Sequence, residues 1–246
     1  MTKNFKLIIE YDGSRYHGWQ RQKDEPSIQG ELEKALKTIT AKKVTVVGSG
    51  RTDAGVHAEG QVANFECDTR LKPEALMNAL NSLLAQDIKV KACEQVNASF
   101  HARYDAKSKI YHYRILNRAT PAAIGRQYLW FVRKALNREA MRAAIAHILG
   151  RHDFKAFEGS GSPRMSSTRH VYSAGLVEHE GGLLVFHIEA DGFLRYMVRN
   201  IVGTLVDVGL KKLTPHDFKR ILDSKDRSQA GATAPAQGLI LVEVKY

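Results

Sequence analysis

The chain has 246 residues, of which 43% are hydrophobic and 26% are charged, as in an ordinary globular protein. It holds no run of about 18 apolar residues and does not begin like a signal peptide, so we expect a cytoplasmic protein that does not span a membrane. An excess of 37 Lys and Arg over 26 Asp and Glu gives a net charge of +11. Such an excess is typical of proteins that bind RNA or DNA, and it does not distinguish between them.

The two cysteines, Cys67 and Cys93, have no further cysteine pair or histidine cluster near them at the spacing of zinc ligands. The sequence therefore favours two reduced, partly buried thiols over a redox or nucleophilic role. It predicts no metal site.

The first part of the chain predicts alternating strands and helices. Phe5, Leu7, Ile9 and Tyr11 share one face of a half-buried strand, because alternate side chains point to opposite faces. The elements expected after it are a helix over 28–39 capped by Ser27, strands over 43–47 and 61–65, a helix over 73–84 and a strand over 88–96.

The second part repeats this series without visible sequence identity. The elements expected are a strand over 110–116, a helix from Asn137 to 149, a loop over 158–167, a hairpin of 170–179 and 183–190 around Gly181-Gly182, a helix over 193–208, a short helix capped by Thr214 and a strand over 239–244.

The mixture of hairpins and helices predicts an α+β fold with mostly antiparallel sheets and helices on one face. We expect an N-terminal half over residues 1–107 and a C-terminal half over residues 108–246. Because no linker composition marks the division, the halves are expected to share a continuous body.

Residues 48–58 (GSGRTDAGVHA) surround a single carboxylate, Asp53, with glycines and place Arg51 two residues before it. Glycines permit backbone angles that other residues resist, and they let a substrate approach closely. An Asp near Gly also commonly bonds its own backbone in a turn, and composition alone favours that structural interpretation. The segment is not a phosphate-binding loop, since it lacks the GxxxxGK[ST] pattern.

Residues 191–203 (DGFLRYMVRNIVG) carry Arg195 and Arg199 one helical turn apart at the edge of an apolar stripe. An arginine beside a core face usually needs an anionic partner, although its charged head can also reach water. The pair, followed by Asn200, favours a partnered, functional arginine.

Residues 107–114 (KSKIYHYR) predict a strand with Tyr111 and Tyr113 on one face and His112 and Arg114 on the other. Aromatic side chains on a strand can stack on a splayed base, but taken alone a packing pair is the better interpretation. Residues 11–22 (YDGSRYHGWQRQ) interleave basic, aromatic and amide side chains. That pattern suits looped RNA and a well-packed loop equally.

Together these segments resemble the A-type tRNA pseudouridine synthases. The resemblance rests on motifs in the family's order: EYDGSRYHGWQRQ, GSGRTDAGVHA, FHARYDAKSKIYHYRI, FLRYMVRNIVGTLVDVG and ATAPAQGLILVEVKY. It implies two ferredoxin-like α+β halves whose sheets are continuous across a central cleft, a homodimer, and no metal or organic cofactor. It also implies the activity, which is conversion of uridines 38, 39 and 40 in the anticodon arm of tRNA to pseudouridine.

Residue roles carry over from the family position by position. Asp53 matches the catalytic aspartate, a nucleophile, and Arg199 matches the basic residue that pairs with it. Tyr111 matches the tyrosine that lies against the target base, and Arg51 matches the arginine that helps to turn this base out of the stack. Further candidates for substrate contact are Arg195 and His57. The chain departs from the family pattern at Ile110, where a basic residue can occur, and in the loop 158–167.

Pseudouridine formation breaks the N1–C1′ bond, rotates the uracil and joins C5 to C1′, so nothing is oxidised and no cofactor is required. A carboxylate can serve as nucleophile or base, and attack at C1′, attack at C6 and a glycal route stay open for Asp53. One rival function is an RNA-binding module without catalysis, which leaves the lone Asp53 beside Arg51 unexplained. Another is a metal-independent RNA hydrolase, for which the sequence offers no histidine pair. Mass-neutral conversion of tRNA uridine without strand cleavage distinguishes the three.

Overall fold

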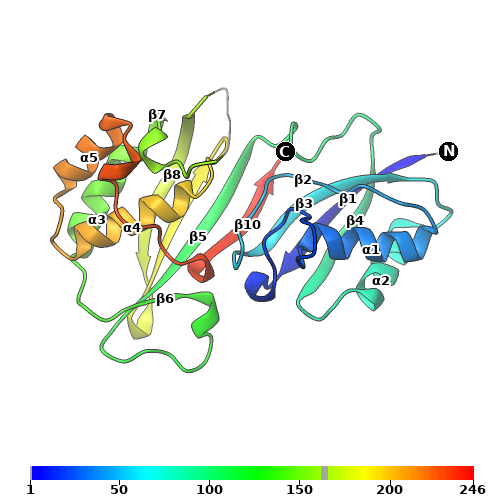
Figure 1. Cartoon of the computed structure of the whole chain (residues 1–246), viewed down its shortest axis with the longest axis horizontal. Coiled ribbons are helices and arrows are strands. Elements are labelled where there is room, and N and C mark those ends of the chain that lie inside the picture. Colours follow the sequence, from blue (N-terminus) through cyan, green and yellow to red (C-terminus); the bar gives the residue numbers. More distant parts are fainter. Residues whose placement is uncertain (1, 162–165) are drawn as a thin grey trace. The chain divides into compact units, whose positions relative to one another are not determined.

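Figure 1 shows the chain as a computed structural model, which describes residues 2–161 and 166–246. The fold is α+β, and its sheet is mixed and mostly antiparallel, which confirms the predicted fold class. The chain divides into two compact units, Met1–Lys107 with Ile240–Tyr246, and Ser108–Leu239. The last strand therefore belongs with the first unit, whereas the division expected from the sequence left it with the C-terminal half.

The first unit is ferredoxin-like, because its elements follow in the order β-α-β-β-α-β. Strand β1 lies between β3 and β4 and is antiparallel to both, β2 is antiparallel to β3, and β10 pairs with β3 in parallel. The elements are β1 (Lys3–Tyr11), α1 (Ile28–Thr40), β2 (Val47–Gly48), β3 (His57–Cys67), α2 (Pro73–Leu83), β4 (Ile88–Val96) and β10 (Leu239–Lys245).

The predicted alternation along β1 is confirmed, since Phe5, Leu7 and Ile9 are fully buried. The strand predicted over 43–47 is wrong except at its end, where β2 holds only Val47 and Gly48. Side chains of α1 take the place of a neighbouring strand there. Glu33 Oε1 accepts from the Val46 amide at 3.1 Å, and Gln29 Nε2 donates to the Val46 carbonyl at 3.0 Å. Buried backbone groups need partners, and here the helix provides them.

In the second unit the strand order is β5-β9-β8-β7, with antiparallel neighbours, and the short β6 pairs with β5 in parallel. Helices α3, α4 and α5 pack against one another. The elements are β5 (Ser108–Asn117), β6 (Trp130–Val132), α3 (Arg138–Ile145), β7 (Gly150–Asp153), β8 (Thr168–Glu178), β9 (Leu183–Ala190), α4 (Met197–Gly209) and α5 (Pro215–Ser224).

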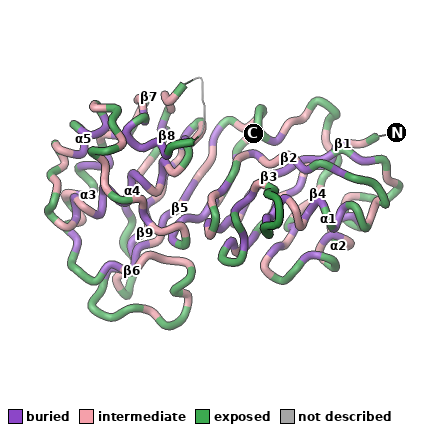
Figure 2. The backbone as a smooth tube through the Cα atoms, viewed as in Figure 1, coloured by how far each residue is buried: buried purple, intermediate pink, exposed green. Residues whose placement is uncertain are grey.

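Helix α1 begins at Ile28 as predicted, although the Ser27 side chain forms no capping hydrogen bond. The predicted starts of α3 and α5 are also confirmed, and there a side chain does cap the helix. Asn137 accepts from the Ala140 amide at the start of α3, and Thr214 forms a capping box with Asp217 at the start of α5. The start predicted at Phe193 is wrong, because α4 begins at Met197 after Tyr196 adopts a left-handed conformation with φ of 61°. Most residues of α4 are buried, and in Figure 2 buried segments are coloured purple.

Residues 162–165 of the predicted loop 158–167 lie outside the described part of the chain. Among the residues that the structure describes, no helix has the length and apolar character needed to cross a membrane.

Candidate active site

Asp53 lies in the connection between β2 and β3, and the backbone on either side of it is bonded to another segment. The Trp19 amide donates to the Thr52 carbonyl at 3.1 Å, and the Gly55 amide donates to the Tyr16 carbonyl at 3.3 Å. The turn itself is closed by the Asp53 carbonyl, which accepts from the Val56 amide at 3.1 Å. Asp53 is partly exposed, as a group that meets a substrate must be.

Two glycines let the segments 13–19 and 52–56 approach each other closely. A Cβ atom on Gly13 would lie 2.0 Å from the Val56 carbonyl oxygen, and one on Gly18 would lie 2.4 Å from that of Thr52. Gly18 also has a φ of 89°, which L side chains rarely adopt. The glycines in residues 11–22 therefore allow this segment to pack on the Asp53 loop. This agrees with the interpretation of residues 11–22 as a well-packed loop.

Tyr11 anchors the same loop from the end of β1. Its hydroxyl lies 2.8 Å from Thr52 Oγ1, and the ring is 3% exposed. Burial raises the pKa of Tyr11 to about 12, so the phenol stays protonated at neutral pH. The residue immediately before Asp53 is thus held by its side chain as well as by its carbonyl.

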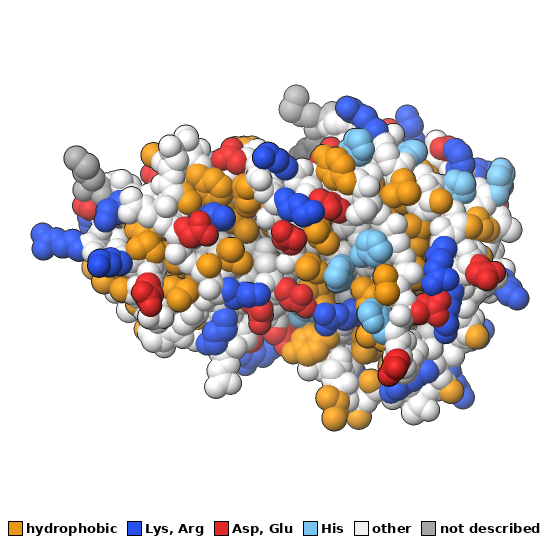
Figure 3. Space-filling model, turned by 180° about the vertical axis from the view of Figure 1, so that it is seen from behind, with side chains coloured by type: hydrophobic (Ala, Val, Ile, Leu, Met, Phe, Trp, Pro, Cys, Tyr) orange, Lys and Arg blue, Asp and Glu red, His pale blue; other side chains and the backbone are white. Residues whose placement is uncertain are grey.

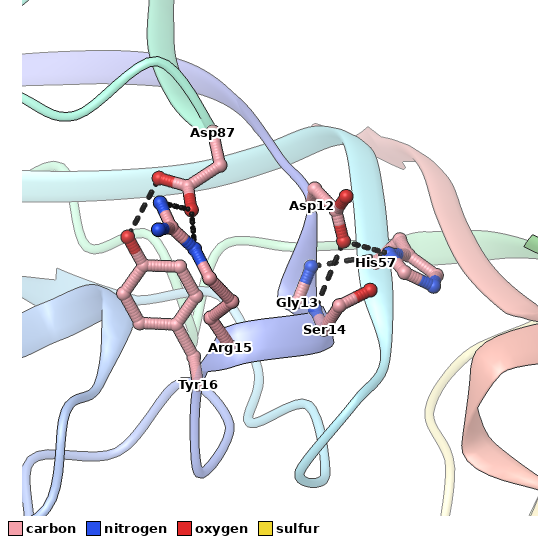
Figure 4. Close-up of polar contacts among 7 residues, drawn as sticks. All are labelled: Asp12, Gly13, Ser14, Arg15, Tyr16, His57 and Asp87. Carbon is pink, nitrogen blue, oxygen red and sulfur yellow. Dashed lines mark hydrogen bonds and ion pairs between the residues drawn. The ribbon is translucent and has the colours of Figure 1, made fainter. Parts of the chain in front are cut away.

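Figure 4 shows Asp12 and His57 facing each other beside Gly13. The buried His57 ring has Nδ1 at 3.1 Å from both the Gly13 amide and Asp12 Oδ1, and that oxygen also accepts from the Ser14 amide at 2.9 Å. A ring nitrogen that accepts from an amide carries no proton, so the Gly13 bond belongs to neutral His57 and an ion pair with Asp12 to its protonated form. In either form His57 holds the start of the 13–19 segment.

In the second unit, Tyr111 and Tyr113 lie on the same face of β5 as predicted, but their surroundings differ. Tyr113 is fully buried and donates to the Pro235 carbonyl at 2.7 Å, which makes it a packing residue. Tyr111 is 7% exposed and meets Phe193 edge to face, with ring centroids 5.0 Å apart. Edge-to-face contact fixes the plane of an aromatic ring.

Arg195 and Arg199 meet on one aromatic ring although only Arg199 lies in α4. Their guanidinium carbons are 4.8 and 5.0 Å from the centre of the Tyr196 ring. Arg199 Nε donates to the Ala234 carbonyl at 2.8 Å, whereas the exposed Arg195 donates to the Ser160 carbonyl at 2.8 Å. Backbone carbonyls fix each guanidinium, and a carbonyl does not neutralise its charge.

Asn200, next to Arg199, joins the motif of α4 to the C-terminal motif ATAPAQG. It is fully buried, donates to the Phe157 carbonyl at 2.8 Å and accepts from Thr233 at 2.7 Å and Arg227 at 3.1 Å. The Ala234 amide in turn donates to the Arg199 carbonyl at 3.1 Å. A buried amide with all its partners fixes one arrangement of the surrounding backbone. The first turn of α4 is accordingly rigid.

Comparison with known proteins assigns nearly the whole chain to the family that its sequence motifs resemble. A family model described as tRNA pseudouridine synthase matches residues 7–105 and 144–246. Proteins named tRNA pseudouridine synthase A from Clostridium acetobutylicum, Acetivibrio thermocellus and Pseudothermotoga lettingae are 47%, 46% and 42% identical over 244 residues, which is 99% of this chain and 100% of each relative. This chain belongs to the tRNA pseudouridine synthase family.

Among solved structures, the archaeal box H/ACA sRNP Nop10-Cbf5 complex aligns with 97% of this chain and 46% of that chain, at 13% identity and a TM-score of 0.33. That likeness is too low to bear on function. The two ranges matched to the tRNA pseudouridine synthase family include Arg51, Asp53 and His57 in the first unit, and Arg195 and Arg199 in the second. Tyr111 lies between the matched ranges.

Burial determines the state of the two cysteine thiols. Cys67 and Cys93 are free thiols, and burial raises the pKa of Cys93 to about 12, so it is protonated at neutral pH. The described residues contain no group of three or more His, Cys, Asp or Glu side chains placed to hold a metal ion.

The sequence did not reveal several residues that shape the site, notably Tyr196, Phe193 and Asp87. The sequence predicts that Tyr196 is part of a helix, and no local pattern predicts a left-handed conformation at this position. On the face drawn in Figure 3, Lys and Arg side chains are interspersed with Asp and Glu.

Proposed function

We propose that this chain isomerises uridines 38, 39 and 40 in the anticodon arm of tRNA to pseudouridine, with Asp53 as its essential carboxylate. One observation carries the proposal. The chain belongs to the tRNA pseudouridine synthase family, and the single carboxylate of the motif RTDAGVH lies in a loop whose backbone is bonded on both sides of it. A reacting group held this firmly avoids the loss of rate that comes with imprecise positioning.

The reaction matches what a carboxylate can do. The N1–C1′ bond breaks, the uracil rotates and C5 bonds to C1′, while the hydrogen of C5 moves to N1, so that the product has the mass of the substrate. Asp53 serves as nucleophile or removes the proton. Attack at C1′, attack at C6 and a glycal intermediate are distinct routes that share this residue.

The other residues of the proposal act on the target base and on charge. Tyr111 lies against the base after extrusion, where stacking returns roughly 1–3 kcal/mol of the few kcal/mol lost on leaving the helix. Arg51 assists the extrusion, and Arg199 stabilises the ionised carboxylate that the reaction uses. Arg195 and His57 complete the set of substrate contacts, and a homodimer presents the anticodon arm to residues of both subunits.

Mapping of pseudouridine at nucleotide resolution tests the proposal. Pure protein is incubated with unmodified tRNA transcripts that carry uridine at 38, 39 or 40, and with the same transcripts carrying cytidine there. We expect pseudouridine at these positions, no change of RNA mass and no strand cleavage. Pseudouridine elsewhere in the tRNA would refute the assigned positions, and bound but unmodified tRNA would leave a binding module as the function.

A further inference from the structure

We propose that Asp87, a residue outside the five family motifs, is a positioning residue for the Asp53 loop. It acts through Arg15 and Tyr16 and does not touch the substrate. The proposal rests on the proposed role of Asp53.

Asp87 lies in the turn before β4 and collects bonds from one short segment. Figure 4 shows both Arg15 and Tyr16 pointing at its carboxylate. Arg15 donates to Oδ2 through Nε at 2.8 Å and also through Nη2, while the Tyr16 hydroxyl donates to Oδ1 at 2.7 Å. The Asp87 carbonyl accepts from the Asp12 amide at 2.9 Å. One residue of the turn thus fixes the 12–16 segment through both its backbone and its side chain.

The partners of the ion pair between Asp87 and Arg15 differ in burial. Its side chain is 13% exposed, whereas that of Arg15 is 73% exposed. Charge-assisted bonds are short and directional, but an ion pair with one exposed partner adds little to global stability. Burial, together with the bond to Asp87, raises the pKa of Tyr16, so that its hydroxyl remains a donor. The arrangement therefore specifies a conformation more than it stabilises the fold.

The segment held by Asp87 is the one that holds the Asp53 loop. The Tyr16 carbonyl accepts from the Gly55 amide at 3.3 Å, and three residues later the Trp19 amide donates to the Thr52 carbonyl at 3.1 Å. Gly13 and Gly18 leave no free space between the two segments. A shift of residues 13–19 is consequently passed to the backbone on both sides of Asp53. Every contact in this series lies within the first unit.

The consequence for catalysis follows from the sensitivity of reaction rates to geometry. A displacement of about 1 Å at a reacting group costs on the order of 100-fold in rate. Replacing Asp87 by Asn removes the charge and one of the two acceptor oxygens. The change weakens the attachment of Arg15 and Tyr16 while leaving every side chain of the Asp53 loop intact. The change should slow the chemical step and leave tRNA binding nearly as it was.

The test compares Asp87→Asn, Tyr16→Phe and Arg15→Gln with the wild type. Single-turnover rates at saturating enzyme, tRNA dissociation constants and thermal melts are measured below all melting temperatures. We expect the Asp87→Asn rate to fall about 10- to 100-fold with a dissociation constant within about threefold of wild type, and a smaller fall for Tyr16→Phe, which removes one hydroxyl. Both substitutions weaken the same attachment between Asp87 and Tyr16. The double variant that combines Asp87→Asn with Tyr16→Phe should therefore be no slower than Asp87→Asn alone.

Asp217→Asn is the matched control. Asp217 also receives bonds from backbone, side chain and arginine, in the capping box of α5 in the second unit. Its replacement should lower the melting temperature and leave the single-turnover rate unchanged. A wild-type rate for folded Asp87→Asn would overturn the proposal, as would a loss confined to the dissociation constant, which would make Arg15 a direct RNA contact. Should Asp87→Asn not fold, Tyr16→Phe decides in the same way. Absence of pseudouridine with the wild-type protein would instead overturn the proposed function.

Discussion

The Asp53 loop and the entrance to α4 are both rigid, but they are held by different means. Around Asp53, backbone groups of residues 13–19 bond to backbone groups of residues 52–56, and glycines permit the close approach. At the entrance to α4, side chains bond to carbonyls, and two guanidinium groups stack on Tyr196. The difference shows which substitutions each region tolerates. In the first region the Asp53 side chain can be changed without removing a backbone bond, whereas in the second the side chains are themselves the scaffold.

The largest effect should come from Asp53, because its replacement leaves the backbone bonds of its loop in place. For Asp53→Asn and Asp53→Ala we expect turnover to fall by at least about 1,000-fold, since an amide or a methyl group is no nucleophile or base at neutral pH. Binding of tRNA should change little, because phosphate contacts supply most of the affinity.

Single-turnover rates, tRNA dissociation constants and thermal melts check this prediction. The Ala variant is the cleaner one, since Asn can deamidate to Asp. If both folded variants make pseudouridine at close to the wild-type rate, Asp53 serves only the turn.

The two arginines on the Tyr196 ring should differ in effect although they share that ring. Arg199→Glu should lower turnover about 100-fold, the loss typical of removing one preorganised charged group, with less effect on tRNA binding. Arg195→Glu is the matched control, because it makes the same charge change at an exposed arginine that also bonds to a carbonyl. Steady-state kinetics and binding assays compare the two. Equal losses of turnover would remove the special role of Arg199.

Much of the fold follows from local sequence. The alternation of β1 and the caps of α3 and α5 involve residues within a few positions of one another, so pattern and propensity predict them. The Asp53 and Arg199 motifs were likewise visible, because each occupies one short segment.

The remaining features depend on contacts between distant segments. Glu33 replaces a strand beside Val46, the left-handed Tyr196 delays α4 to Met197, and Asp87 meets Arg15 across 72 residues. Neither hydrophobic period nor capping pattern records such pairs, because tertiary packing decides them.

Gly13→Ala tests the backbone packing of the first region directly. The added Cβ would lie 2.0 Å from the Val56 carbonyl oxygen, a backbone atom that cannot turn aside. We expect a loss of about 1–3 kcal/mol in the free energy of unfolding, typical of overpacking, together with reduced turnover. Gly125→Ala is the control, since Gly125 has a φ of 72° but nothing within 4 Å of its Cβ position. Backbone strain alone should cost it about 1 kcal/mol. Denaturant unfolding measures both. Because Gly13 itself has no positive φ, a Gly13→Ala protein no less stable than Gly125→Ala would show that the contact with Val56 relaxes at little cost.

The smallest effects should come from Tyr196, where ring and hydroxyl can be separated. The ring carries both guanidinium groups, while the hydroxyl accepts from Arg195 Nη2 at 3.1 Å. Tyr196→Phe keeps the ring, so turnover and stability should stay close to wild type. Tyr196→Leu keeps similar bulk but has no π face, and losing a stacked cation costs about 0.5–1 kcal/mol at such sites. The left-handed backbone is common to Tyr, Phe and Leu at this position, so strain does not separate the variants. We therefore expect the Leu variant to unfold at lower denaturant concentration and to turn over a few-fold more slowly, because Arg199 loses the aromatic ring beside its guanidinium group. Unfolding curves and single-turnover rates for the two variants decide the matter. A Phe variant as impaired as the Leu variant would show that the hydroxyl, through Arg195, orders the entrance to α4.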